Sequence, residues 1–173
     1  MRIQEHVKLS GAAALVALPW LKGDVWIPFV ASLGIDVDHY LWHAVTHRTL
    51  SLREAVRYFG QADPPQLRQQ RLLHQPVVLG MLLFVAAWTR SRVLWLILMG
   101  LLFHVGLDVV HITQMGRLKR MLSEQAGFRC PECGRDCEVL QLHTVAFARS
   151  VFDRYNAGHF VVLCPGCHER AHG

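Results

Sequence analysis

Cysteine is missing from the first 129 residues of this 173-residue chain, and formal charge is missing from two long stretches before residue 110. The missing cysteines exclude a disulfide framework in this part. The stretches 72–89 and 93–107 contain no Asp, Glu, Lys or Arg, and only three residues separate them. Such a pair predicts a helical hairpin that is long enough, or nearly so, to span a bilayer. The alternative is a buried hairpin in a soluble all-α domain, because Gly and His interrupt both runs.

Hydrophobic residues make up 52% of the chain, and its mean hydropathy of +0.24 is high for a soluble protein. These residues are concentrated before about residue 112, so the first part is either deeply buried or membrane-associated. We expect the apolar run 9–21 to be retained rather than cleaved as a signal peptide. The reason is that Glu5 precedes it and no small-x-small cleavage site follows.

The positive charge of the chain is unevenly distributed. Residues 1–122 contain 13 Lys and Arg against 7 Asp and Glu, whereas residues 123–173 contain 5 against 6. The basic excess of the first part favours membrane lipids or phosphate substrates as partners, and it leaves nucleic-acid binding by the tail as a weaker alternative. Basic residues beyond both ends of the hairpin outweigh those of its turn. By the positive-inside rule we expect a protein of the cytoplasmic membrane whose C-terminal module faces the cytoplasm.

The segment 34–47 concentrates metal-binding residue types on one predicted helix. One face of that helix carries a carboxylate and three imidazoles, namely Asp36, His39, His43 and His47. On this periodicity Asp38 points the other way. Buried carboxylates and imidazoles cost desolvation free energy unless a charge neutralises them, and a divalent cation is the commonest remedy. The pattern therefore predicts a metal site.

A second polar stripe lies on the second helix of the predicted hairpin. There His104, Asp108 and His111 are spaced i, i+4 and i+7, and so they share a face. His74 lies at the start of the first helix of the hairpin, and His6 lies near the N-terminus. Because ionisable groups inside apolar helices are expensive, two such stripes on helices that pack together favour one shared site.

Two serines mark predicted helix starts. Ser10 is a candidate N-cap for a first helix from residue 11 to about 21. Ser51 and Glu54 form a capping box that predicts a short helix ending at Tyr58.

Four spaced motifs contain the residues of both stripes. They are His6 before an apolar run, Asp36-Val37-Asp38-His39 after a second run, Arg71-Leu72-Leu73-His74 at the start of a third, and the segment 100–108 with His104 and Asp108. Together they resemble the YdjM-like family of membrane-bound metal-dependent hydrolases, over roughly residues 1–115. That family is usually related to the zinc-dependent phospholipase C fold. The resemblance implies an all-helical domain that holds two or three divalent cations, with zinc the first choice, and hydrolyses a phosphoester.

The resemblance implies seven ligands, which are His6, Asp36, Asp38, His39, His74, His104 and Asp108. Asp36 or Asp38 would orient the attacking water, so these two are the catalytic candidates. Periodicity and resemblance disagree about Asp38. A helix that begins only after Asp38 would let both carboxylates turn inward and would remove the disagreement.

The tail contains all five cysteines, and four of them form two Cys-x-x-Cys pairs, Cys130 with Cys133 and Cys164 with Cys167. Paired thiolates on two knuckles complete a tetrahedral site, so this spacing predicts structural Zn²⁺ in a reducing compartment. A fragment this small cannot fold on its apolar content alone, and the metal would supply much of its stability. The short segments 137–145 and 159–163 are strand candidates, and residues 167–172 open a short helix.

The tail from Cys130 to His172 also resembles the HNH endonuclease family, which has a treble-clef fold. The closest match is the segment 159–172, and Leu140-Gln141-Leu142-His143-Thr144-Val145 lies where that family has its catalytic pair. The resemblance implies that His143, His168 and His172 take metal-ligand positions, and that His159 occupies the position of the central Asn. Threonine replaces the general base at position 144 and cannot serve at neutral pH. Either His159 substitutes as the base, or the module is a catalytically silent zinc scaffold.

These observations predict a mainly α protein in two domains. Residues 1–122 would form a membrane-associated, phospholipase C-like helical bundle, residues 123–128 a linker, and residues 129–173 a small α+β treble-clef zinc module. We expect a metal-dependent phosphoester hydrolase that uses the helical site. The alternatives are a membrane-tethered HNH-type endonuclease, which would use the tail, and a non-catalytic membrane adaptor with structural zinc.

Overall fold

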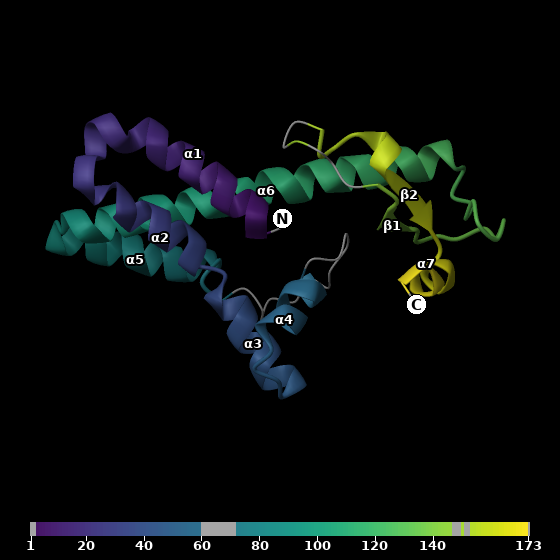
Figure 1. Cartoon of the computed structure of the whole chain (residues 1–173), viewed down its shortest axis with the longest axis horizontal. Helices are drawn as coiled ribbons and strands as arrows, with labels where there is room; N and C mark the ends of the chain where they lie inside the picture. Colours follow the sequence, from purple (N-terminus) through teal and green to yellow (C-terminus); the bar gives the residue numbers. More distant parts are fainter. Residues whose placement is uncertain (1–2, 60–71, 147–149, 151–152, 173) are drawn as a thin grey trace. The chain divides into compact units, whose positions relative to one another are not determined.

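The computed structural model of the chain describes residues 3–59, 72–146, 150 and 153–172. It is mainly helical and contains one small two-stranded sheet near the C-terminus (Figure 1). The mainly α class expected from the sequence is confirmed. The described residues fall into two compact units, and the boundary lies inside the longest helix, after Val109.

The first unit is helical. Its elements are α1 (Ile3–Leu21), η1 (Lys22–Val25), α2 (Trp26–Gly34), α3 (Val37–His47), α4 (Leu52–Phe59), α5 (Pro76–Thr89) and the first half of α6 (Arg92–Gln125). The expected N-cap at Ser10 is wrong, because α1 begins at Ile3 and Ser10 lies inside it. The helix start at Ser51 is confirmed, since the backbone N–H of Glu54 donates to Ser51 Oγ at 3.3 Å. The capping box forms only in part, because the N–H of Ser51 donates to Thr49 Oγ1 and not to Glu54.

The predicted hairpin is present as α5 and α6. Pro76 occupies the start of α5, where a missing N–H costs nothing, and Arg90 ends it in the left-handed region with φ 51°. With 14 residues, α5 is about 21 Å long, which is shorter than the roughly 30 Å hydrocarbon core of a bilayer. Two helical runs are long and apolar enough to cross a membrane, namely Gln4–His47 and Arg92–Gln125.

The surface of the first unit is unusually apolar. Large side chains on α1, α2 and α5 are more than 60% exposed, among them Leu15, Trp20, Trp26, Phe84 and Trp88. Exposed apolar patches of this kind mark a surface that a membrane or another partner covers.

Helices α2 and α6 cross at very close range. A Cβ atom added to Gly100 would overlap the backbone of Pro28, so only glycine permits this approach. The close crossing places α2 directly against the turn of α6 that follows Gly100, and this turn contains His104.

The second unit is small and is built on a hairpin. Strands β1 (Gln141–Thr144) and β2 (Phe160–Leu163) pair antiparallel, with Leu142 opposite Val162. The short helix η3 (Ala157–His159) precedes β2, and α7 (Pro165–His172) follows it. Strands β1 and β2 lie within the segments predicted from the sequence, and α7 begins two residues before the predicted helix.

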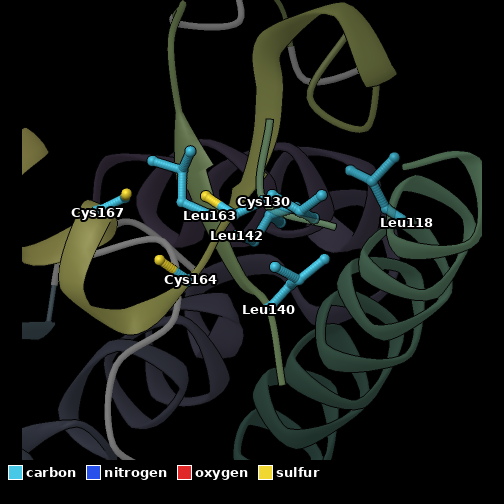
Figure 2. Close-up of a cluster of buried hydrophobic side chains, with 8 residues drawn as sticks. Leu118, Cys130, Leu140, Leu142, Leu163, Cys164 and Cys167 are labelled. Atoms are coloured by element: carbon cyan, nitrogen blue, oxygen red, sulfur yellow. The ribbon is translucent and has the colours of Figure 1, made fainter. Parts of the chain in front are cut away.

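The core of this unit combines cysteines with aliphatic side chains (Figure 2). Its buried members are Leu118, Cys130, Leu140, Leu142, Val162, Leu163, Cys164 and Cys167. Leu118 comes from α6, so the last turns of this helix pack on the hairpin. The first half of the segment expected to be a linker continues α6 to Gln125, and Ser123 is buried.

Candidate metal centres

A break between α2 and α3 shapes the first candidate site. Helix α2 ends at Gly34 and α3 begins at Val37, so a turn at residues 35 and 36 interrupts the helical periodicity. The carbonyl oxygen of Asp36 accepts the backbone N–H of His39 at 3.1 Å and thereby starts α3. Because Asp36 precedes the helix, its side chain and that of Asp38 both reach the same cluster. The helix-face prediction that Asp38 points away is therefore wrong.

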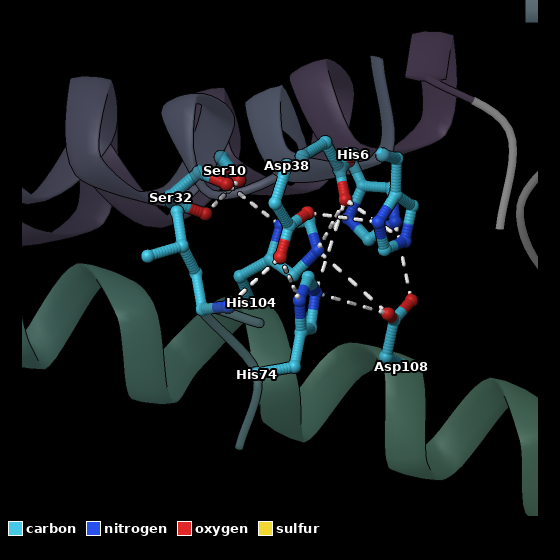
Figure 3. A network of polar contacts seen from close by, with 10 residues as sticks. His6, Ser10, Ser32, Asp38, His74, His104 and Asp108 are labelled. Atoms are coloured by element: carbon cyan, nitrogen blue, oxygen red, sulfur yellow. Dashed lines mark hydrogen bonds and ion pairs between the residues drawn. The ribbon is translucent and has the colours of Figure 1, made fainter. Parts of the chain in front are cut away.

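Seven side chains from distant segments converge on this cluster (Figure 3). They form three overlapping groups, and within each group the ligand atoms all lie within 4.8 Å of one another. The groups are His6 with His104 and Asp108, Asp36 with His74 and His104, and Asp38 with His39 and His74. These are the seven residues that the resemblance implies, and the structure brings all of them together.

The closest approaches within the cluster join imidazole nitrogens to carboxylate oxygens. His6 Nε2 lies 3.3 Å from Asp108 Oδ1, and His104 Nε2 lies 3.4 Å from Asp36 Oδ1. His39 Nδ1 lies 2.8 Å from Asp38 Oδ1. His104 and His74 each belong to two of the groups, so they bridge adjacent positions for a cation.

Hydrogen bonds from outside the cluster orient two of its members. Nδ1 of His104 lies 2.6 Å from the carbonyl oxygen of Ser32, which leaves Nε2 facing the carboxylates. The backbone N–H of Leu73 donates to Asp38 Oδ2 at 2.8 Å and fixes this carboxylate beside His74. Such contacts to the second nitrogen or oxygen of a ligand are typical of metal sites.

Several polar atoms of the cluster are buried without a hydrogen-bond partner in the described part of the chain. They are Nε2 of His104, both ring nitrogens of His74 and Nδ1 of His6. Each buried and unsatisfied group costs about 1–3 kcal/mol. Divalent cations would satisfy these lone pairs and neutralise the carboxylates, so the residues present fit such ions.

Exposure differs across the cluster. His6, His104 and Asp108 are at most 5% exposed, whereas the side chain of Asp36 is 28% exposed. Solvent therefore reaches the cluster on the side where Asp36 lies.

Three histidines singled out from the sequence lie elsewhere. The rings of His43 and His47 contact each other at a tilt of 34° with centroids 4.5 Å apart, and both pack on Tyr58 of α4. His111 belongs to the second unit, where its Nδ1 lies 3.2 Å from the hydroxyl of Tyr155. None of the three belongs to a group of metal-binding donors among the described residues.

Sequence reasoning missed the role of Ser10 and Ser32 beside the cluster, where Ser32 accepts the bond from His104 and contacts Ser10. Both are buried, and their hydroxyl oxygens lie 2.9 Å apart across α1 and α2. A signal was present in their spacing, because Ser10 follows His6 by four residues and Ser32 precedes Asp36 by four residues.

The second candidate site is formed by four cysteines of the tail. The sulfur atoms of Cys130, Cys133, Cys164 and Cys167 all lie within 4.8 Å of one another, as their spacing predicts. Cys130 and Cys133 lie on a tight turn closed by the N–H of Gly134, which donates to the Cys130 carbonyl at 2.8 Å and has φ +69°. Cys164 and Cys167 lie at the start of α7, where Cys133 Sγ and Cys164 Sγ are 3.7 Å apart.

The surroundings shift the pKa values of two of these thiols in opposite directions. Burial opposes ionisation of Cys130, but hydrogen bonds from the backbone at Cys164 and Cys133 lower its pKa to about 6. Burial, together with the neighbouring thiols, raises the pKa of Cys167. A divalent cation removes this conflict because it stabilises all four thiolates at once.

The histidines of the expected nuclease site are spread over two places. The rings of His143 on β1 and His168 on α7 meet edge to face at 5.4 Å. His159 Nε2 lies 2.8 Å from Asp153 Oδ2 instead. The side chain of His172 lies outside the described part of the chain. None of His143, His159 and His168 belongs to a group of three or more metal-binding donors among the described residues.

Among known proteins, no family model, no curated protein and no solved structure matches this chain.

Proposed function

We propose that the protein is a metal-dependent hydrolase of phosphoesters, and that its active site is the His/Asp cluster of the first unit. The observation that carries this proposal is the convergence of seven metal-binding side chains, among which several buried ring nitrogens have no hydrogen-bond partner in the described part of the chain. Clusters of imidazoles and carboxylates of this kind suit zinc and similar divalent ions. The resemblance to the YdjM-like family implies the same ligands and the same reaction class.

The ligands would be His6, Asp36, Asp38, His39, His74, His104 and Asp108, and they provide for two or three cations. Such ions would polarise the phosphoryl oxygens and lower the pKa of water. In the reaction, water adds to phosphorus while the bond from phosphorus to the leaving alcohol oxygen breaks. One proton of that water finally resides on the alcohol. Asp36, as the most exposed carboxylate of the cluster, is the residue best placed to orient the water and accept its proton.

The test is hydrolysis of bis(p-nitrophenyl) phosphate by purified protein, combined with metal analysis. We expect activity that a chelator removes and zinc restores, and three or more metal ions per chain. His104→Ala should abolish activity and reduce the metal content to about one ion per chain, held by the cysteines. His47→Ala is the matched control, because His47 is exposed and lies outside the cluster. A wild-type protein with a single zinc and no hydrolysis would contradict the proposal.

For the tail we propose a structural Zn²⁺ held by the four cysteines in a treble-clef arrangement. A knuckle, a β-hairpin and a helix that starts at the second cysteine pair support this assignment. The alternative, an HNH-type nuclease, would use His143, His159 and His168. Against it, His159 is paired with Asp153, and Thr144 occupies the base position. A nuclease activity lost in His143→Ala but kept in His104→Ala would favour this alternative.

We also propose that the first unit lies in the cytoplasmic membrane, with the zinc module in the cytoplasm. Two helical runs of sufficient length and the exposed apolar side chains of α1, α2 and α5 support this. The protein should then remain in the membrane fraction after washing with high salt and carbonate. Cys133 is exposed, so an impermeant thiol reagent should label it once zinc has been removed. We expect this labelling in opened cells and none in intact cells.

A further inference from the structure

The first unit contains an apolar cavity that the proposed reaction has not used. Its volume is about 150 Å³, and it lies between α1, α2 and α6. The wall is formed mainly by three alanines of α1 (Ala13, Ala14, Ala17), by Val25, Pro28 and Phe29, and by Met99, Gly100 and Phe103 of α6. The only polar side chains in the wall are those of Ser10 and Ser32, whose hydroxyls bond to each other.

The cavity and the metal cluster lie on the same faces of the same three helices. Each helix carries a cluster residue, and the cavity residues follow at intervals of four along it. On α1 the series is His6, Ser10 and Ala14. On α2 and the turn after it, the series is Asp36, Ser32 and Pro28. On α6 it is Asp108, His104 and Gly100. Four residues advance a helix by about 6 Å, so the cavity lies about 6–12 Å from the ligands.

The pair of serines marks the end of the cavity nearest the cluster. Ser32 takes part in both places, because its hydroxyl lines the cavity and its carbonyl oxygen accepts the bond from His104. A group bound in the cavity therefore lies directly behind a ligand of the proposed metal site, as the neighbouring positions of Ser10, Ser32 and His104 in Figure 3 illustrate.

The chemistry of the wall selects an apolar occupant. One of the two hydroxyls donates to the other, and the rest of the wall is apolar, so a polar ligand would lose most of its bonds to water and regain few. An apolar cavity of the same volume in another protein stays dry and holds benzene, so this one has room for about six carbon atoms. The neighbouring surface of α1 and α2 is itself apolar, which lets an alkyl chain arrive from a bilayer.

We propose that this cavity binds the alkyl chain of the substrate, so that the phosphoester hydrolysed is that of a lipid. The proposal rests on the function proposed above and names its substrate class. The phosphate would lie at the His/Asp cluster, and the later carbons of the chain would lie between α1, α2 and α6. A nucleotide or nucleic acid would leave the cavity empty.

The first test compares p-nitrophenyl phosphodiesters whose second alcohol is methanol, butanol or hexanol. Since burial of one methylene contributes about 0.8 kcal/mol, kcat/KM should rise by up to about fourfold for each added methylene. Ala14→Phe fills the cavity and should bring the hexyl-to-methyl ratio close to one. Ala12→Phe places the same side chain at an exposed position of α1 outside the cavity, and it should keep the wild-type ratio.

The outcomes separate the two proposals. If wild-type protein hydrolyses all three esters at equal kcat/KM, the lipid assignment is wrong and the hydrolase assignment stands. If it hydrolyses none of them, the hydrolase assignment fails. The wild-type series does not depend on whether any variant folds.

The second test does not use activity. A hexyl phosphate with a diazirine at the end of its chain should label peptides from α1, α2 and α6 on irradiation. Unmodified hexyl phosphate should compete for labelling more strongly than inorganic phosphate, which can occupy the cluster but not the cavity. Labelling spread over the exposed apolar faces of α1 and α5, with none at the cavity, would overturn the assignment.

Discussion

Nδ1 of His104 lies 2.6 Å from the carbonyl oxygen of Ser32, across the contact between α6 and α2. A carbonyl oxygen can only accept, so Nδ1 must carry the proton, and the lone pair of Nε2 faces Asp36 and Asp108. One backbone oxygen thus sets the tautomer that a metal ligand needs.

This relationship predicts different results for two substitutions of His104. In His104→Asn the amide N–H can still donate to Ser32, but the second nitrogen is gone, so the unit should fold and lose metal from the helical cluster. In His104→Ala the carbonyl oxygen of Ser32 is left buried without its partner, which should cost a further 1–3 kcal/mol or so of unfolding free energy. Metal content per chain and thermal unfolding distinguish the two variants. Equal metal content in wild type and Asn variant would contradict a ligand role.

Two substitutions of Asp38 can likewise separate the effect of its charge from the effect of its hydrogen bond. It accepts the N–H of Leu73 and lies beside His39 and His74. In Asp38→Asn the amide oxygen can still accept from Leu73, while the negative charge is lost. Metal affinity of the helical cluster should then fall by about 10–100-fold or more, measured by competition with a chelator. Asp38→Ala should in addition lower the melting temperature, because Leu73 loses its acceptor.

The close crossing of α2 and α6 predicts that Gly100 tolerates no side chain. Gly100→Ala would force α2 away from α6 and should cost about 1–3 kcal/mol of unfolding free energy, with loss of metal from the cluster. Gly106→Ala on the same helix is the control, because its Cβ would meet no atom within 4 Å. It should keep the metal and stabilise the helix by up to about 1 kcal/mol. Thermal unfolding and metal analysis of both variants provide the test.

The sequence predicted which side chains meet in the cluster more reliably than it predicted the local geometry that brings them there. His104 and Asp108 were found because i, i+4 spacing on a continuous helix fixes a shared face. Asp38 was misplaced by the same argument, since a turn of two residues after Gly34 resets the periodicity and no proline announces it. The resemblance includes Asp38 in the set because it does not assume a continuous helix, and the structure groups Asp38 with His39 and His74.

Long-range packing was the part that sequence could not supply. Nothing in the local sequence indicates that Gly100 meets Pro28, or that Ser10 meets Ser32, because such contacts depend on how separate helices cross. The cavity arises from the same crossings, and it therefore becomes visible only in the structure. In the tail, by contrast, the two Cys-x-x-Cys pairs already determine which side chains meet, since zinc geometry leaves few choices.

The tail itself yields the last prediction. Cys164 and Cys130 are both part of the buried core and of the metal group, so Cys164→Ser should remove the zinc and unfold the second unit. Cys137→Ser is the matched control, because Cys137 lies beside the core but outside the group of four thiols. We expect one metal ion fewer per chain and rapid proteolysis after residue 125 in Cys164→Ser only. The metals of the helical cluster should remain, because none of their ligands lies in the second unit. Simultaneous loss of both sets of metals would instead mean that the two sites depend on each other for folding.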